Sequence, residues 1–206
     1  MRTGILGGTF DPIHIAHLHA AQTALHQAGL DRVLIMPAGD PWQKTNRMVT
    51  PAHRRLEMAR HAVAGVDGLE VDDRELGRDG PTYTVDTLAT FPEEEQLHLI
   101  MGADAALGLP TWRDADRVRS MATILVLPRP GVDSTVVGQL IPEAVFLDMA
   151  LLEISGTEIR EMAMRGAPFR FLVTEPVHHY IVIHGLYAQN TSDDRVGASN
   201  DTEDSP

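Results

Sequence analysis

The chain has 206 residues, of which 43% are hydrophobic, and its formal net charge is −12. A chain of this length can bury a full core as one domain, hiding roughly 70% of its unfolded surface. The lack of cysteine excludes disulfides and cysteine-ligated metal centres, and the acidic balance argues against a general nucleic-acid binder. We find neither a signal peptide nor an apolar run of about 18 residues, so we expect a cytoplasmic protein.

Short apolar runs alternate with helical patterns along most of the chain. The expected strands are Gly4–Leu6, Val33–Met36, Leu69–Val71, Leu97–Met101, Thr123–Leu127 and Val145–Leu147. The expected helices are Ile15–Ala28, Pro51–Ala64, Val85–Leu88, Ala115–Met121, Thr157–Arg165 and Pro176–His184. This alternation predicts an α/β fold, a single Rossmann-like, doubly wound parallel sheet with helices on both faces. Ligands of such sheets bind outside the carboxyl ends of the strands.

The pattern predicts one folded domain over residues 1–188 and an acidic tail over residues 189–206. The tail holds five acidic residues against one basic residue and almost nothing apolar, so we expect it to be disordered. Thr50 and Pro51 fit a helix N-cap followed by proline at the first helical position. Gly185 fits a helix stop.

Gly7 and Gly8 lie where the first strand ends and a helix is about to begin. A tight turn there leaves backbone N–H groups free beside the positive end of a helix dipole, which makes an anion site. His14 and His17 are three residues apart on the first helical turn, so both rings leave the same face of the helix. A phosphate bound there would meet two imidazoles and several amides, the outline of a phosphoryl or nucleotidyl transfer site.

A second anion site is expected at the helix that follows Ser155. Ser155 and Glu158 have the spacing of a capping box, which predicts a helix starting at Gly156 or Thr157. Arg160 can reach a phosphate from the next turn. Taken alone, this segment is better explained as an ordinary capped helix with a solvated arginine. A polyphosphate-binding protein this acidic must concentrate its few positive groups locally, and Lys44, Arg129 and Arg160 are the candidates.

Gly7–His17 resembles the nucleotidyltransferase signature G-G-T-F-D-P-x-H-x-G-H, with Ala16 where the family usually has glycine. Ile154–Arg160 is similar to the family's I-S-S-T-x-I-R motif, which closes over the ATP phosphates, with Gly156 in place of the second serine. The resemblance implies catalytic roles for His14, His17 and Arg160. Lys44 matches the basic residue of a family loop that contacts phosphate. The implied phosphate ligands are Gly7, Gly8, Thr9, Phe10, Lys44, Ser155, Thr157 and Arg160.

Further segments resemble the nicotinate mononucleotide branch of this family. Gly80–Leu88 is similar to its G-P-S-Y-T-x-x-T-L motif, and Leu109–Trp112 to its x-P-x-W, in which tryptophan stacks on the pyridine ring. Gly102–Asp104 is similar to a G-x-D that contacts a ribose, and Arg129 stands in the family's R-P-G turn. The implied mononucleotide contacts are Tyr83, Thr84, Gly102, Asp104, Trp112 and Arg129.

Taken together, these motifs resemble the bacterial nicotinate-nucleotide adenylyltransferases, which implies that ATP and nicotinate mononucleotide give pyrophosphate and deamido-NAD, a step in NAD synthesis. The implied partners are these two substrates, with no nucleic acid or membrane and with a homo-oligomer left open. Mg²⁺ would arrive on ATP and keep its waters, so the chain needs no acidic metal cage.

Three other functions stay open from the sequence. One is another member of the superfamily, a pantetheine-phosphate adenylyltransferase or a cytidylyltransferase, against which Gly80–Leu88 and Trp112 count. The second is a metallohydrolase built on His14 and His17, which lacks a third ligand at fixed spacing. The third is a non-catalytic nucleotide sensor, which only a turnover measurement would exclude.

Overall fold

The computed structural model describes residues 1–39, 49–78 and 80–188. Its centre is a six-stranded sheet of order β3-β2-β1-β4-β5-β6 in which every neighbouring pair is parallel. The strands are β1 (Arg2–Gly8), β2 (Arg32–Pro37), β3 (Leu69–Val71), β4 (Gln96–Gly102), β5 (Ala122–Leu127) and β6 (Val145–Phe146). The predicted doubly wound sheet is therefore confirmed, and each predicted strand is present.

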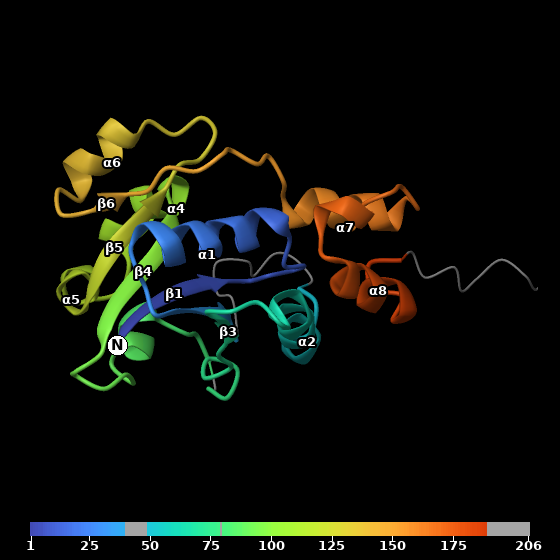
Figure 1. The fold of residues 1–206 in the computed structure, drawn as a ribbon, viewed down its shortest axis with the longest axis horizontal. Helices are drawn as coiled ribbons and strands as arrows, with labels where there is room; N and C mark the ends of the chain where they lie inside the picture. Colours follow the sequence, from blue (N-terminus) through green and yellow to red (C-terminus); the bar gives the residue numbers. More distant parts are fainter. Residues whose placement is uncertain (40–48, 79, 189–206) are drawn as a thin grey trace, which may run out of the picture.

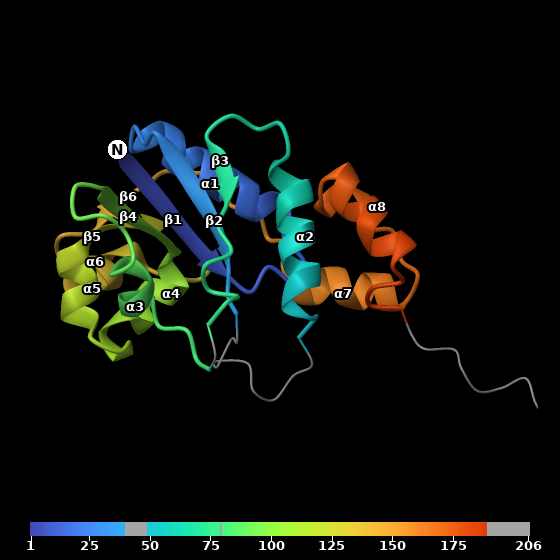
Figure 2. The ribbon, with the colours of Figure 1, turned by 90° about the horizontal axis from the view of Figure 1, so that it is seen from below.

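Helices cover both faces of this sheet. In Figure 2, α1 lies on one side of the strands and α3, α4 and α5 lie on the other. The α-helices are α1 (Ile15–Gln27), α2 (Ala52–Val63), α3 (Thr84–Leu88), α4 (Ala103–Gly108), α5 (Ala115–Met121), α6 (Ser134–Leu140), α7 (Gly156–Met164) and α8 (Glu175–Ile183). The 3₁₀ turns are Leu109–Thr111 and Arg170–Leu172. In the part of the chain described, no helix is long and apolar enough to cross a membrane.

The strands read as continuous apolar runs because both of their faces are buried. On β5, Leu125 and Leu127 pack into the core under α1, α2 and α8, whereas Ile124 and Val126 pack into the core under α3, α4 and α5. The alternation of side chains along a strand thus divides one sequence run between two cores. Both cores lie directly behind the carboxyl ends of the strands and hold the loops there in place.

One local prediction is wrong, two short helices were missed, and one local prediction is confirmed. Helix α2 begins at Ala52 and Pro51 is its N-cap, with ψ of 139°, so the proline precedes the helix rather than opening it. Helices α4 and α6 were not predicted, because half of α4 is alanine with no distinct apolar face and α6 is rich in weak helix formers such as valine and glycine. Gly185 does follow the last helix with φ of +57°, the left-handed conformation of a helix stop. Residues 189–206 lie outside the described residues, so the predicted disorder stays a prediction.

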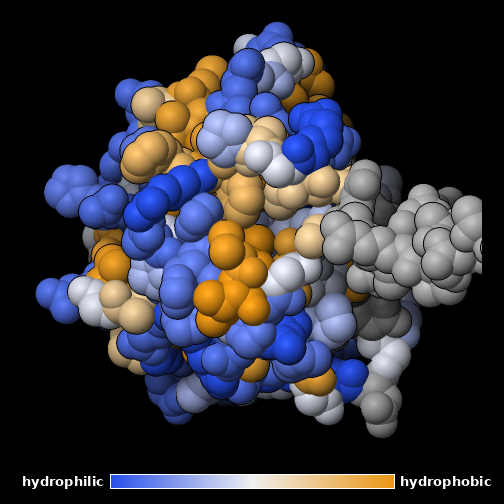
Figure 3. Space-filling view, turned by 90° about the vertical axis from the view of Figure 1, so that its right-hand side faces the viewer, coloured by the Kyte–Doolittle hydropathy of each residue, from blue (hydrophilic) through white to orange (hydrophobic). Residues whose placement is uncertain are grey.

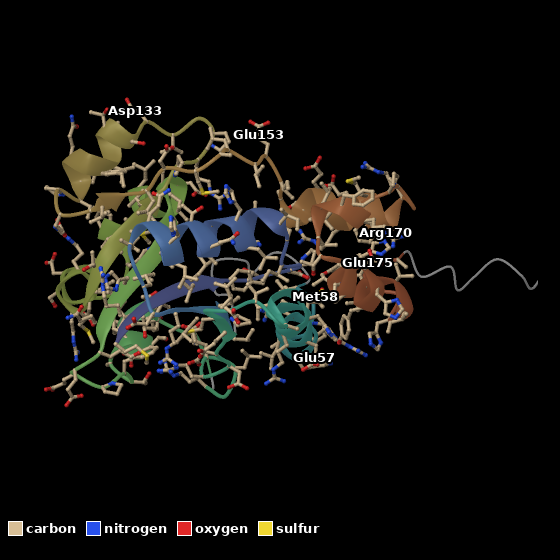
Figure 4. The ribbon with its side chains drawn as sticks, viewed as in Figure 1. Glu57, Met58, Asp133, Glu153, Arg170 and Glu175 are labelled. Atoms are coloured by element: carbon tan, nitrogen blue, oxygen red, sulfur yellow. The ribbon has the colours of Figure 1, made fainter. Side chains whose placement is uncertain are left out.

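The C-terminal helices form the end of the molecule beside α2, away from β6 (Figure 1). Arg170 and Glu175 form an ion pair of 2.7 Å near the start of α8 (Figure 4). Figure 3 views this end and shows apolar areas set among polar ones. The large exposed apolar residues carried by α7, α8 and the turn between them are Met164, Phe171, Val182 and Ile183.

Candidate active site

The predicted anion site lies at the point where the strand order reverses. Strand β1 pairs with β2 on one side and β4 on the other, so the crossovers leave it in opposite directions. Its last residues, Gly7 and Gly8, lead into the turn before α1, as predicted. The N–H of Ala38 donates to the Gly8 carbonyl at 2.9 Å and so holds this end of the strand against the end of β2. A crevice at this position is where doubly wound sheets bind their ligands.

His14 and His17 stand together at the start of α1. Their rings are stacked, with centroids 3.6 Å apart and planes 26° from parallel, which confirms that they share one face of the helix. The backbone N–H of His14, the N-cap, donates to Nδ1 of His17 at 3.2 Å. The edge of the Phe10 ring packs against His17, with centroids 4.9 Å apart. Both imidazole planes are thereby fixed before any ligand binds.

His14 is held neutral. Burial lowers its pKa to about 4, and the positive charge of Arg129 adds to the effect. Its Nδ1 is buried and has no hydrogen-bond partner among the described residues. A neutral imidazole next to a phosphate can donate or accept one hydrogen bond but brings no charge of its own. The positive charge for an anion must therefore come from neighbouring groups.

The N-terminus of α7 meets the same turn. Ser155 is the N-cap of α7, and its Oγ accepts from the N–H of Glu158 at 3.1 Å, so the helix starts at Gly156, as predicted. A Cβ on Gly156 would lie 2.8 Å from the carbonyl oxygen of Asp11. The glycine that departs from the family motif is thus what lets α7 approach so closely.

Arg160 crosses from α7 to the turn after β1. It donates to the backbone carbonyl of Asp11 and, at 3.2 Å, to Oγ1 of Thr157. Only 13% of its side chain is exposed, and a carboxylate oxygen of Asp11 lies 3.9 Å away. The structure therefore brings together the two predicted anion sites, the start of α1 and the start of α7, through this arginine.

Gly102, Asp104 and Arg129 also converge on this crevice, from the carboxyl ends of β4 and β5. Arg129 Nε lies 3.4 Å from Oδ1 of Asp104, and a Cβ on Gly102 would lie within 2.6 Å of both side chains. Gly102 and Arg129 line one pocket together with His17. The other walls of this pocket are apolar, formed by Leu6, Ala16, Leu127, Met149, Leu151 and Leu152.

Tyr83 and Trp112 lie at another part of the surface. Tyr83 is the N-cap of α3, which begins at Thr84, and Trp112 follows the 3₁₀ turn before α5. Both rings pack against the core that lies under α3, α4 and α5. The guanidinium of Arg113 lies 4.7 Å from the centroid of the Tyr83 ring and pairs with Asp86 at 3.5 Å. This arginine joins the two predicted pyridine-binding segments, and no sequence motif singles it out.

Sequence reasoning also missed Arg55 of α2, whose side chain is buried and bonds to the turn after β1. Its partners are backbone carbonyls, which carry no sequence signal. Lys44, the remaining predicted phosphate ligand, lies outside the described residues. Among the residues described, no three His, Cys, Asp or Glu side chains are grouped so that they could hold a metal ion.

The model of the cytidylyltransferase-like family matches residues 5–162. A protein of Corynebacterium kroppenstedtii named "Probable nicotinate-nucleotide adenylyltransferase" is 42% identical over 97% of this chain and 95% of its own length. The chain belongs to the nicotinate-nucleotide adenylyltransferase family. A second member, from Pseudomonas syringae pv. tomato and of the same name, is 42% identical over 92% of this chain and 96% of its own. These are nucleotidyltransferases of NAD biosynthesis.

Solved structures show the same fold at much lower identity. The nicotinic acid mononucleotide adenylyltransferase of Plasmodium falciparum, complexed with NaAD, superimposes with a TM-score of 0.77. The match covers 90% of this chain and 97% of the other at 17% identity. The complex of the same Plasmodium enzyme with APC gives a TM-score of 0.76. The doubly wound architecture of the family is therefore retained in this chain.

Proposed function

We propose that this protein transfers the adenylyl group of ATP to nicotinate mononucleotide, giving deamido-NAD and pyrophosphate. The phosphate oxygen of the mononucleotide attacks the α-phosphorus of ATP in line, a new P–O bond forms, and the bond to the β-phosphate breaks as pyrophosphate leaves. The proposal is carried by the stacked His14–His17 pair at the start of α1, together with Arg160, which reaches the turn after β1 from α7. The names of the relatives support the choice of substrates.

The phosphates of ATP would lie between the two helix N-termini. His17 accepts a backbone N–H at Nδ1, so the hydrogen of its neutral ring lies on Nε2, where it can donate to the α-phosphate. His14 stands beside it as a second neutral imidazole. Arg160 would exchange its contact with the Asp11 carbonyl for a charge-assisted bond to phosphate. The remaining proposed donors are the backbone of Gly7, Gly8, Thr9 and Phe10, and the side chains of Lys44, Ser155 and Thr157.

The adenosine of ATP would lie over the apolar residues beside His17, since the hollow of about 40 Å³ between them is too small to enclose a base. Flat bases bind in largely apolar pockets that carry a few polar groups at the edge. Asp104 and Arg129 form such an edge, where a carboxylate can accept from ribose hydroxyls. Because Gly102 and Arg129 line the His17 pocket and Trp112 lines a different one, we assign Gly102, Asp104 and Arg129 to ATP rather than to the mononucleotide.

The pyridine ring would stack on Trp112, with its carboxylate turned towards Tyr83, Thr84 and Arg113. A guanidinium already held over the Tyr83 ring offers two parallel donors to a carboxylate. A carboxamide has one acceptor oxygen and an NH₂ group, which would face these donors unfavourably. This difference supports nicotinate over nicotinamide mononucleotide.

Mg²⁺ would enter as part of the substrate, bound to the ATP phosphates and retaining its waters. It would neutralise charge on the phosphates during transfer. The chain's own residues would position the two substrates and donate hydrogen bonds, so most of the rate enhancement would come from orientation and electrostatic stabilisation.

One incubation tests the proposal. The purified protein is mixed with ATP, Mg²⁺ and either nicotinate or nicotinamide mononucleotide, and the products are separated and weighed by mass spectrometry. We expect deamido-NAD and an equal amount of pyrophosphate with nicotinate mononucleotide. Parallel mixtures with CTP, or with pantetheine phosphate as acceptor, test the related activities. Turnover only with CTP as the nucleotide or only with pantetheine phosphate as the acceptor, or no turnover at all, would overturn the proposal.

A further inference from the structure

Arg55 places a guanidinium in the interior directly beneath the phosphate-binding turn. Only 1% of the residue is exposed. Nη1 donates to the Thr9 carbonyl at 2.8 Å and Nε donates to the Thr50 carbonyl at 2.9 Å. Nη2 donates to the carbonyls of Ala38 and Gly39 at 2.8 and 3.1 Å. One side chain of α2 thus ties together three backbone segments, after β1, after β2 and before α2.

The bond to Thr9 fixes the orientation of one peptide group. In a trans peptide the carbonyl and the following N–H point in opposite directions. Since the Thr9 carbonyl points inward to Arg55, the N–H of Phe10 points away from Arg55. Phe10 itself has φ of +49°, a conformation that is costly for any residue with a side chain. Its conformation is maintained by the surrounding contacts, which include the bond from Arg55 to the carbonyl of Thr9, the preceding residue.

Asp11 provides the opposite charge for this buried guanidinium. Its carboxylate is turned into the framework, where Oδ1 accepts from the hydroxyl of Tyr187 at 2.7 Å and Oδ2 accepts from the N–H of Thr50 at 3.2 Å. Burial lowers the pKa of Arg55 and the charge of Asp11 opposes this effect. A guanidinium in a protein stays protonated, so the arrangement is a compensated pair of buried charges.

We infer that Arg55 is a positioning residue for adenylyl transfer, which aims the N–H of Phe10 at the ATP phosphates by holding the Thr9 carbonyl from within. The inference rests on the proposed function, because it takes the turn after β1 to be the phosphate site. Arg55 does not touch the substrate. It acts through the peptide group between Thr9 and Phe10.

The matched pair of variants is Arg55→Lys and Arg54→Lys. The ammonium of lysine retains the charge but cannot donate to carbonyls on three segments at once, as the planar guanidinium does. Arg54 is the neighbouring residue of α2 and bonds to the Tyr180 hydroxyl at 3.1 Å, so its replacement also removes a bond between segments without touching the turn. We expect Arg55→Lys to lower kcat/KM for ATP about a hundredfold, with the KM for nicotinate mononucleotide changed less than threefold. Equal kinetics for the two lysine variants would overturn the inference.

A second, spectroscopic measurement tests whether the N–H of Phe10 faces the phosphates, and it does not require Arg55→Lys to fold. The chain has five phenylalanines, so ¹⁵N-phenylalanine labelling gives five amide resonances at most. The resonance that vanishes in Phe10→Tyr belongs to Phe10. Adding magnesium pyrophosphate to the unmodified protein should shift this resonance, whereas that of the exposed Phe171 should stay in place.

These outcomes separate the inference from the proposed function. If the protein forms deamido-NAD but pyrophosphate leaves the Phe10 resonance unmoved, the positioning role of Arg55 is wrong and the function stands. If no dinucleotide forms while Phe10 still responds to pyrophosphate, the assigned reaction is wrong and the turn remains an anion site.

Discussion

The backbone helps to orient the His17 ring. The N–H of His14 donates to Nδ1, and the rings of His14 and Phe10 pack against it. A carboxylate partner would favour the protonated ring, whereas an amide donor favours the neutral one with its hydrogen on Nε2. The His17 ring can therefore present a hydrogen-bond donor on Nε2 to phosphate.

Replacing His17 with alanine should leave the fold intact and lower kcat by about 10²–10³, because a preorganised donor to transition-state charge is lost. The measurement is steady-state kinetics beside a circular dichroism spectrum. His26→Ala is the control, since His26 is exposed in the last turn of the same helix. A folded His17→Ala protein with near-normal kcat would exclude the proposed role.

His14 should make stability depend on pH. Its folded-state pKa of about 4 lies below the ordinary value of 6.5, so between these values the unfolded chain binds a proton that the folded chain does not. Stability then rises with pH across this window and falls as pH drops from about 6.5 to 4. The contribution at pH 4 reaches about 3 kcal/mol.

His14→Asn keeps a residue that caps helices and removes the titration. Urea unfolding of both proteins at pH 7 and pH 4 measures the effect. We expect the unmodified protein to lose more stability than the variant between these two pH values, by up to about 3 kcal/mol. The same loss in both proteins would mean that His14 titrates normally in the folded state.

At the scale of elements, the start of α3 and the turn before α5 form one surface through Arg113. Trp112 can stack on a pyridine ring whatever its substituent, while Arg113 responds to the charge of the substituent. Trp112→Ala should therefore raise the KM for nicotinate mononucleotide roughly ten- to a hundredfold, from a stacking energy of about 1–3 kcal/mol. The preference over nicotinamide mononucleotide and the KM for ATP should change little.

Arg113→Gln should have the opposite signature. Loss of the guanidinium removes a charged donor to the carboxylate, so the ratio of kcat/KM between the two mononucleotides should fall roughly tenfold, from the loss of about 1.5 kcal/mol. The ratio for the unmodified protein and the ratio for Arg113→Gln are both obtained from initial rates with each mononucleotide. A ratio unchanged in Arg113→Gln would show that selectivity depends on other groups near Tyr83 and Thr84.

The strands could be predicted because burial on both faces leaves a continuous apolar run. Most helices could be predicted because burial on one face leaves apolar residues three and four apart. Helices α4 and α6 left no such pattern, because half of α4 is alanine and α6 contains several weak helix formers. The histidine pair and the capped start of α7 were predictable because their spacing alone places side chains on one face. Arg55 and Arg113 were not, because tertiary packing decides which carbonyls or rings an arginine meets.

On the scale of the whole molecule, Asp11 connects parts of the chain that lie far apart in sequence. Tyr187 follows α8 with φ of +67°, and its hydroxyl bonds to the Asp11 carboxylate and lies 3.9 Å from Sδ of Met58. In Figure 4, Met58 and Glu57 are labelled on α2 near the C-terminal helices. Burial, and next the charge of Asp11, raise the pKa of Tyr187 well above its usual value, so the hydroxyl remains a donor. The end of α8 thus supports the phosphate-binding turn.

This connection predicts where the chain can be shortened. A protein ending at Ala188 loses only residues 189–206, an acidic and polar segment, and should keep its melting temperature and activity. A protein ending at Gly185 also loses Leu186, which packs against the core, and Tyr187. Tyr187→Phe isolates the hydroxyl. It should cost roughly 1.5–3 kcal/mol, since a hydrogen bond to a charged group is lost, which lowers the melting temperature by about 3–12 °C.

Calorimetry on the three proteins tests the argument. The chain ending at Gly185 should melt at or below the temperature of Tyr187→Phe, because it loses the same bond and apolar contacts as well. Its activity should fall too, since Asp11 and the turn after β1 lose their support. A drop of several degrees on removing residues 189–206 alone would mean that those residues pack on the domain. Unchanged melting of Tyr187→Phe would mean that the Asp11 carboxylate needs no donor from the end of the chain.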